Sequence, residues 1–290
     1  MDTAALMIRN LNLSYQDGLI VDDVTLGLKP QELGCLLGPS GCGKSTLLRA
    51  IAGFQELDSG EIWLDNELLS TERRRIPPED RGVGMVFQDI ALFPHLSVGD
   101  NIAFGLTDWP EISQYKRVAE LLDLIGLMGL DQRYPHELSG GMRQRVMIAM
   151  ALQCNPSLLI ADEPTTALDV TIQAQILDLM MDLKDKRKEA AILLITHDLA
   201  VVAETCDRII VMYGGEIQEI APVEELFKNP LHPYTKALMK SIPHLDTKSE
   251  RLYALRGMVP SFINMGDECK FCNRFDPDEC ACKGTKKSYE

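Results

Sequence analysis

A glycine-rich stretch, GPSGCGKST, occupies residues 38–46 and ends in one lysine and two hydroxyl side chains. Glycines allow a backbone to wrap closely around an anion, so that its N–H groups surround phosphate oxygens. Lys44 can then reach the β- and γ-phosphates of a nucleotide, and the Ser45 hydroxyl can bind Mg²⁺. The pattern predicts an ATP site in a phosphate loop (P-loop). The residues expected to form it are Gly38, Pro39, Ser40, Gly41, Cys42, Gly43, Lys44, Ser45 and Thr46.

Two carboxylates, Asp162 and Glu163, follow the apolar run at residues 158–161. In P-loop enzymes a carboxylate at the end of a buried strand holds Mg²⁺, and Asp162 can do so through a water molecule. Glu163 is then placed to polarise a second water molecule for attack on the γ-phosphate. Acidic pairs are also common in ordinary loops. The apolar strand before this pair and the P-loop elsewhere in the chain favour the catalytic interpretation.

The elements that must position these side chains follow from the spacing of apolar residues. Short apolar runs bounded by turn residues predict strands within residues 7–37 and at 157–164 and 190–197. Apolar residues at helical spacing predict helices at 44–53, over most of 112–154, and at 171–184. Strands that alternate with helices indicate a mainly parallel sheet covered on both faces, so the expected fold class is α/β.

Composition narrows the function classes. The net charge of −14 argues against non-specific nucleic-acid binding, which needs a broad basic surface. No apolar run approaches the roughly 20 residues that cross a bilayer, and the N-terminus lacks the pattern of a secretory signal. Eight cysteines without such a signal indicate reduced thiols or a metal site rather than disulfides. We expect a protein that works in the cytoplasm or serves a membrane from outside it.

This ordered set of motifs resembles the nucleotide-binding subunit of an ABC transporter, and the resemblance covers about residues 5–245. It implies an α/β P-loop core with an antiparallel β subdomain near the N-terminus and a helical subdomain at about 89–150. The ATP-binding domain would span 5–228, and a short C-terminal extension would span 229–290. The implied activity is ATP hydrolysis with Mg²⁺ that drives a solute through separate integral membrane permease subunits. The chain would lie peripherally at the cytoplasmic face of the membrane.

The resemblance also implies roles for four further residues. Tyr15 matches the aromatic side chain that stacks on adenine, although a lone tyrosine is more often part of a core. Gln88, in GMVFQD, matches the glutamine that touches Mg²⁺ and senses the membrane partner. Asp169, in TALDV, matches the loop aspartate at the seam of a dimer. His197 matches the histidine that contacts the γ-phosphate; without the other motifs it would be interpreted as structural.

The stretch LSGGM at residues 138–142 precedes an apolar helical pattern and offers a hydroxyl and two glycines. A helix N-terminus favours a phosphate, and glycines permit its close approach. The resemblance implies that two subunits pair head to tail, so that Ser139, Gly140 and Gly141 of one close over the ATP of the other. The partner is a second copy or a paralogue, because this chain has a single P-loop and a single LSGG.

Two halves of the sequence indicate different solutes. Residues 87–106 resemble the ATPases of ferric iron and polyamine importers. From about Met142 the sequence is similar to the oligopeptide, dipeptide and nickel importer group, as are NPLHPYTKALMKSIP at 229–243 and MVPSF at 258–262. Relatives of the iron type usually carry a larger regulatory domain than the residues after His197 allow. We therefore favour a peptide or nickel, delivered by an external solute-binding protein.

The extension carries four cysteines within fourteen residues: Cys269, Cys272, Cys280 and Cys282. Four thiolates can hold an iron–sulfur cluster or a tetrahedral Zn²⁺. The resemblance favours an iron–sulfur site, although Phe275 departs from the expected cysteine pattern. Zinc and unligated thiols remain open. Because all the nucleotide motifs end by His197, a cluster here is predicted to be dispensable for ATP binding.

Two functions of other classes compete with transport. ABC ATPases that act on DNA insert a long coiled coil between the P-loop and LSGG, and those that act on ribosomes duplicate the whole cassette. Here fewer than a hundred residues without sustained heptads separate the two motifs, and the cassette occurs once. A redox-sensing interaction protein is supported by the cysteine-rich tail alone. The sequence therefore favours a transport ATPase with no nucleic-acid partner.

Overall fold

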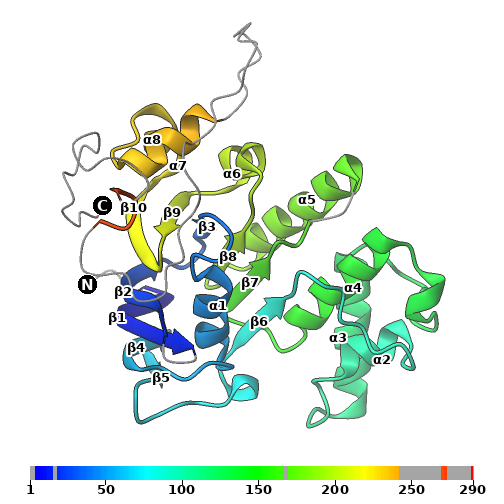
Figure 1. Cartoon of the computed structure of the whole chain (residues 1–290). Coiled ribbons are helices and arrows are strands. Elements are labelled where there is room, and N and C mark those ends of the chain that lie inside the picture. Colours follow the sequence, from blue (N-terminus) through cyan, green and yellow to red (C-terminus); the bar gives the residue numbers. More distant parts are fainter. Residues whose placement is uncertain (1–3, 16–17, 166–168, 242–268, 273–288, 290) are drawn as a thin grey trace, which may run out of the picture.

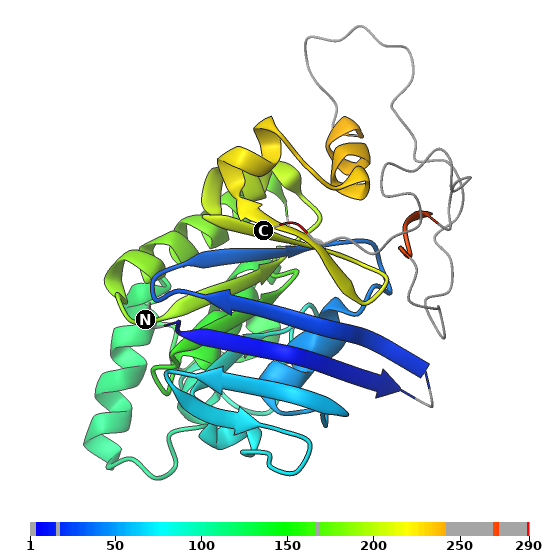
Figure 2. The ribbon, with the colours of Figure 1, turned by 90° about the vertical axis from the view of Figure 1, so that its left-hand side faces the viewer.

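A computed structural model describes residues 4–15, 18–165, 169–241, 269–272 and 289. Two sheets form its framework (Figures 1 and 2). An antiparallel sheet has the strand order β2-β1-β4-β5, and a larger sheet has the order β10-β9-β3-β8-β7-β6. Strands β3, β6, β7, β8 and β9 pair in parallel, and β10 pairs antiparallel with β9 at the edge.

The strands of the antiparallel sheet are β1 (Leu6–Tyr15), β2 (Gly18–Leu28), β4 (Ser59–Leu64) and β5 (Glu67–Ser70). The strands of the larger sheet are β3 (Leu33–Leu37), β6 (Val83–Val86), β7 (Leu158–Asp162), β8 (Ala191–Ile195), β9 (Arg208–Tyr213) and β10 (Glu216–Pro222). The α-helices are α1 (Lys44–Ala52), α2 (Val98–Ala103), α3 (Glu111–Leu124), α4 (Gly140–Leu152), α5 (Val170–Lys186), α6 (Leu199–Thr205), α7 (Val223–Lys228) and α8 (Pro233–Lys240).

The two faces of the parallel sheet bury separate cores because successive side chains of a strand point to opposite faces. Along β8, Leu193 packs with α1 and the antiparallel sheet. Its neighbours Ile192 and Leu194 pack with α4 and α5 on the other face. A third core joins β9 to α7, α8 and the C-terminal segment 269–272. All of β3 and β8 is buried, as expected for strands covered on both faces.

The fold class expected from the sequence is confirmed, and so are the elements that hold the chemistry. Helix α1 ends before Gly53, whose φ of 91° gives it the left-handed conformation that commonly closes a helix. The predicted strands at 157–164 and 190–197 correspond to β7 and β8. Most of 112–154 is helical, as predicted, and turns and one 3₁₀ turn (Pro135–Glu137) separate α3 from α4. No helix in the described ranges is both long and apolar enough to cross a membrane.

Candidate functional site: a nucleotide cavity at the ends of the parallel strands

A cavity of about 610 Å³ lies where the carboxyl ends of four neighbouring parallel strands meet. Ligands of open α/β sheets bind at this edge because loops from several strands converge there. The P-loop follows β3, Gln88 follows β6, Asp162 ends β7, and His197 follows β8. Ten residues predicted for the site line this cavity: Ser40, Gly41, Gly43, Lys44, Ser45, Thr46, Gln88, Asp162, Glu163 and His197.

The P-loop backbone needs glycine at particular positions. Gly41 and Gly43 have φ values of 79° and 102°, in the left-handed region that favours glycine. A Cβ on Gly38 would lie 2.3 Å from the Met212 carbonyl oxygen, so the loop packs directly on β9 at that point. Gly43 is also the N-cap of α1, and no side chain caps the first amides of that helix. These amides are therefore available to an anion in the cavity.

Lys44 supplies the positive charge of the loop. Its ammonium donates to the carbonyl oxygens of Gly38 (2.8 Å) and Pro39 (2.9 Å), which hold it over the loop. The Cys42 Sγ lies 3.9 Å from the same ammonium and its residue is 1% exposed, and burial raises the pKa of its thiol. Cys42 is thus a neutral packing residue behind the loop. The loop offers backbone amides and one ammonium to the cavity, the donor set that fits phosphate oxygens.

The Asp162 carboxylate and the Ser45 hydroxyl meet on the other side of the cavity. Burial raises the pKa of Asp162, and the neighbouring Glu163 charge raises it further, while a hydrogen bond from Ser45 opposes both effects. A carboxylate that is disfavoured in its charged form gains most from a nearby cation. Oxygen ligands from Ser45 and Asp162 beside a phosphate loop fit the preferences of Mg²⁺.

Glu163 and His197 form the outer wall of the cavity. Glu163 has a φ of 48°, which is uncommon outside glycine, and its N–H donates to the Ile195 carbonyl oxygen at 3.0 Å. This bond ties the end of β7 to the end of β8. The His197 Nδ1 lies 3.7 Å from a Glu163 carboxylate oxygen, and the two side chains are 74% and 25% exposed. The pair is open to water on one side, as a hydrolytic site requires.

Eight residues predicted for nucleotide binding do not line this cavity. Three of them, Gly38, Pro39 and Cys42, belong to the P-loop itself. Tyr15, at the end of β1, is 61% exposed. Asp169 is exposed and forms the N-cap position of α5 without a side-chain cap bond. Ser139, Gly140 and Gly141 lie at the start of α4.

The start of α4 is an exposed turn. The Ser139 hydroxyl caps it by accepting from the Met142 N–H at 3.4 Å. A Cβ on Gly140 would meet nothing within 4 Å, whereas one on Gly141 would lie 2.6 Å from Ile172 of α5. Gly141 therefore permits close packing of α4 on α5, and Gly140 leaves an open surface. Within this single chain the exposed Ser139 and the partly exposed Gly140 lie outside the nucleotide cavity.

Sequence reasoning missed Ile20 and Ile195, which also line the nucleotide cavity. Ile20 lies in β2, and its carbonyl oxygen is 3.0 Å from the position that a Cβ on Gly43 would occupy. Neither isoleucine belongs to a motif with recognisable chemistry. Their place at the cavity depends on the pairing of distant strands, so no local signal in the sequence could identify them.

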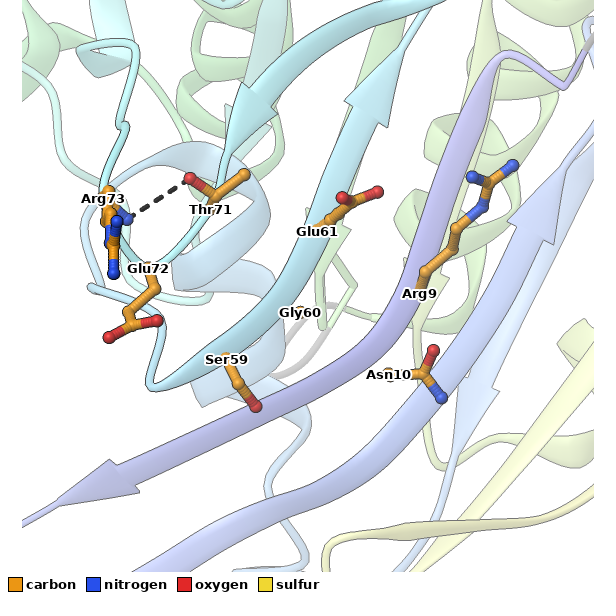
Figure 3. A pocket seen from close by; sticks show the side chains of 8 residues that line it. All are labelled: Arg9, Asn10, Ser59, Gly60, Glu61, Thr71, Glu72 and Arg73. Carbon is orange, nitrogen blue, oxygen red and sulfur yellow. Dashed lines mark hydrogen bonds between the residues drawn. The ribbon is translucent and has the colours of Figure 1, made fainter.

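A second cavity, of about 510 Å³, lies over the antiparallel sheet and is shown in Figure 3. Its side chains come from β1, β4 and the turn after β5, and they carry charges of both signs. None of the residues predicted for nucleotide binding lines it. The lining residues are Arg9, Asn10, Ser59, Gly60, Glu61, Thr71, Glu72 and Arg73.

The described cysteines of the tail, Cys269 and Cys272, lie in one tight turn and are each 2% exposed. Cys272 is disulfide-bonded, which corrects the expectation of reduced thiols at that position. Cys280 and Cys282 lie outside the described residues. Within those residues no three His, Cys, Asp or Glu side chains are grouped so as to hold a metal ion.

The fold and the cavity define a P-loop nucleotide-binding ATPase. Residues 21–166 match the family described as "ABC transporter", and residues 218–282 match "Oligopeptide/dipeptide transporter, C-terminal region". The chain belongs to the ABC transporter family, as an ATP-binding subunit that carries this C-terminal region.

Individual relatives agree with this assignment. Over 269 residues the chain is 46% identical to the oligopeptide transport ATP-binding protein AppD of Bacillus subtilis (strain 168), covering 88% of this chain and 82% of the relative. The structure is similar to cbiO1 from Clostridium perfringens, part of the ABC transporter complex cbiONQ. That match has a TM-score of 0.72 and 32% identity and covers 78% and 92% of the two chains. A dimeric post-hydrolysis structure of the ATP-binding cassette MJ0796, bound to ADP and Pi, matches with a TM-score of 0.67 and 30% identity, over 75% and 98%.

Proposed function

We propose that this chain is the ATP-hydrolysing subunit of an importer of oligopeptides or dipeptides. The observation that carries the proposal is the single cavity that contains Lys44, Ser45, Asp162, Glu163 and His197. The match of residues 218–282 to the peptide-transporter C-terminal region supports peptides as the solute. The chain would act at the cytoplasmic face of the membrane, bound to integral permease subunits and supplied by an external solute-binding protein.

The proposed chemistry assigns each side chain of the cavity a role. The P-loop amides and Lys44 bind the β- and γ-phosphates, and Tyr15 stacks on adenine. Ser45, Gln88 and Asp162 would hold Mg²⁺, which when bound would offset phosphate charge. Glu163 accepts a proton from the attacking water, and His197 orients the γ-phosphate. The 3.7 Å separation of Glu163 and His197 is short enough for both to serve one phosphate.

A second subunit is proposed to complete the site. Ser139, Gly140 and Gly141 do not line the chain's own nucleotide cavity, so the start of α4 would serve the P-loop of a partner. Asp169 would lie at the seam. The dimeric form of the MJ0796 relative supports this pairing, with a second copy or a paralogue as the partner.

The solute is tested by uptake in cells that produce the chain with its membrane and solute-binding subunits. Labelled dipeptides and oligopeptides should accumulate with the unaltered chain and not with the Glu163→Gln variant. Lys228→Met serves as the control, because Lys228 forms only an exposed pair with Glu224. If the cells accumulated nickel, ferric iron or a polyamine and no peptide, the proposed solute would be wrong. ATP hydrolysis that no membrane subunit alters would contradict the transport role itself.

We also propose that Cys269, Cys272, Cys280 and Cys282, when reduced, bind an iron–sulfur cluster. Soft thiolates at this density suit iron–sulfur clusters, and a metal centre cross-links a short polar segment. Protein prepared anaerobically from iron-replete cells should be brown, and a Cys269→Ser variant should lose the colour. Colourless protein with stoichiometric zinc would favour a tetrahedral zinc site. Metal-free protein with freely titrating thiols would contradict both.

A further inference from the structure

The C-terminal segment 269–272 packs into the body of the protein behind the nucleotide site. Figure 2 shows it beside the turn between β9 and β10. Phe271 is 2% exposed and packs edge-on against Tyr213 and Tyr234, with ring centroids 5.4 Å from each. Aromatic contacts of this kind and depth fix a segment in one place. The segment is therefore part of a core that also contains β9 and α8.

Lys270, between the aromatic anchor and Cys269, buries its charge in this core. Its side chain is 4% exposed, and its ammonium lies 2.9 Å from the Glu216 carboxylate and 3.1 Å from the Asp22 carboxylate. The Glu216 side chain is itself 3% exposed. Buried charges of this kind persist only when they are paired with opposite charge. Lys270 thus bridges two strands that are far apart in sequence, β2 and β10.

The two bridged strands meet directly behind the P-loop. The Asp22 N–H donates to the Gly215 carbonyl oxygen at 2.9 Å, and the Gly215 N–H donates to the Cys42 carbonyl oxygen at 3.1 Å. Gly215 has no room for a side chain, since a Cβ would lie 2.1 Å from the Ile20 carbonyl oxygen. The Ile20 carbonyl also faces Gly43 of the P-loop. A continuous set of close backbone contacts therefore runs from the bridged strands to Cys42 and Gly43.

We infer that Lys270 is a positioning residue for the nucleotide site: its ammonium holds β2 and the start of β10 together and so fixes the P-loop at Cys42 and Gly43. The inference rests on the proposed ATP site and adds that the C-terminal extension sets its affinity. Lys270 touches neither the nucleotide nor the reacting water. Its removal takes away the positive charge between Asp22 and Glu216, which favours separation of the two strands that support the loop.

The test compares the full-length chain with Lys270→Met, using MgATP titration by calorimetry and steady-state hydrolysis. We expect the Kd and the KM for ATP to rise about ten-fold, with kcat at saturating ATP within about two-fold of the unaltered chain. Lys270→Arg keeps the charge and should retain most of the affinity. Lys228→Met removes an exposed lysine of the same size and should change neither constant.

A second variant separates positioning from general destabilisation. Glu216→Gln in the Lys270→Met background removes one of the two negative charges and should recover most of the lost affinity. All titrations are made well below the melting temperature of each variant, so unfolded protein does not contribute. Unchanged ATP affinity in Lys270→Met would overturn the inference. The inference would also be overturned if ATP affinity fell only in proportion to thermal stability and Glu216→Gln did not restore it. Lys270 would then stabilise the fold without positioning the nucleotide site.

Failure of this inference can be told apart from failure of the proposed function. If the unaltered chain does not bind MgATP, or binds it equally after Lys44→Ala, the nucleotide site itself is wrong. If Lys44→Ala weakens binding and Lys270→Met does not, the nucleotide site stands and the role of Lys270 fails.

Discussion

Two helix N-termini of this chain, those of α1 and α4, were both predicted to bind phosphate, and they have different surroundings in the structure. Helix α1 begins beneath the P-loop, its first amides lack a side-chain cap, and Lys44, Asp162 and Glu163 share its cavity. Helix α4 begins at the LSGG turn, where Ser139 caps the Met142 N–H and Gly140 borders open space. The N-terminus of α1 thus shares a cavity with charged side chains of the same chain. The start of α4 does not line that cavity.

The two helix N-termini therefore differ in the chemical groups that they can offer to a phosphate. A helix N-terminus offers amides and a partial positive charge, which attract a phosphate but do no chemistry on it. At α1 the ends of β7 and β8 add the carboxylates and the histidine. At α4 only the helix terminus is present, and in the proposed dimer it would contribute to hydrolysis by closing over the site of another chain. The predictions below test this division of roles.

Glu163→Gln should have the largest effect on turnover. Because the amide cannot accept a proton from water, kcat should fall by about 10²- to 10⁴-fold. ATP binding should persist, since the P-loop is unchanged, and an ATP-bound dimer should accumulate. The measurements are phosphate release and size-exclusion chromatography with ATP. Near-normal hydrolysis by this variant would remove Glu163 from the catalytic role.

Ser139→Arg tests the open helix terminus. A long charged side chain in place of the hydroxyl should block closure over a partner's ATP, and hydrolysis should fall by at least about 10²-fold. The ATP affinity of the monomer should stay within about two-fold, because Ser139 does not line the chain's own cavity. Calorimetry on dilute protein and a hydrolysis assay at high protein concentration make the comparison.

Mixing sharpens this prediction. A Ser139→Arg chain combined with a Lys44→Ala chain should form one intact composite site per mixed dimer and regain partial activity. Mixed dimers, verified by two different affinity tags, that stay inactive would contradict a shared site.

Lys44→Ala should weaken ATP binding itself. It removes the ammonium that Gly38 and Pro39 hold over the loop, and hydrogen bonds from a charged donor contribute about 1.5–3 kcal/mol, or about 10- to 100-fold in affinity. Titration of the variant with MgATP measures the loss. If Ser139→Arg lost as much MgATP affinity as Lys44→Ala, the two helix N-termini would not have different roles in ATP binding.

Asp162→Asn should have the smallest effect of these variants. It should slightly raise the melting temperature of the nucleotide-free protein, whereas the other variants lower an activity or an affinity. The raised pKa of Asp162 means that its ionised form is disfavoured in the folded state. This penalty is absent below the ordinary aspartate pKa, grows as pH rises, and is complete above the raised pKa. The variant should therefore melt slightly higher without ligand at pH 7 and lose part of the stabilisation by MgATP. Scanning calorimetry between pH 4 and 8, with and without MgATP, checks both signs. A lower melting temperature for the ligand-free variant would show that the carboxylate stabilises the empty site.

Some elements were predictable because their signals are local. Gly43 and Gly53 bracket α1, and the apolar runs before Asp162 and His197 give β7 and β8 as short, almost continuously buried strands. Strands β9 and β10 were not predicted individually, although β9 contains a run of apolar residues. Strand β9 pairs with β3, more than 160 residues earlier, and no local spacing encodes that contact. Strand β10 reaches the sheet only by pairing with β9.

The amino-acid sequence alone determined the chemical inventory: a P-loop, an acidic pair after an apolar strand, a histidine and an LSGG turn. These motifs depend on residue types at fixed short spacings, so their local backbone geometry follows from the residues themselves. The tertiary structure decided which of them share a cavity, and that Ser139 does not share it. It also decided that Lys270, seventy-three residues beyond His197, lies between Asp22 and Glu216 behind the P-loop. The sequence predicted that a metal cluster in the extension would be dispensable for ATP binding because the motifs end by His197. Contacts between distant segments arise from buried packing and charge pairing, which only the folded chain brings together.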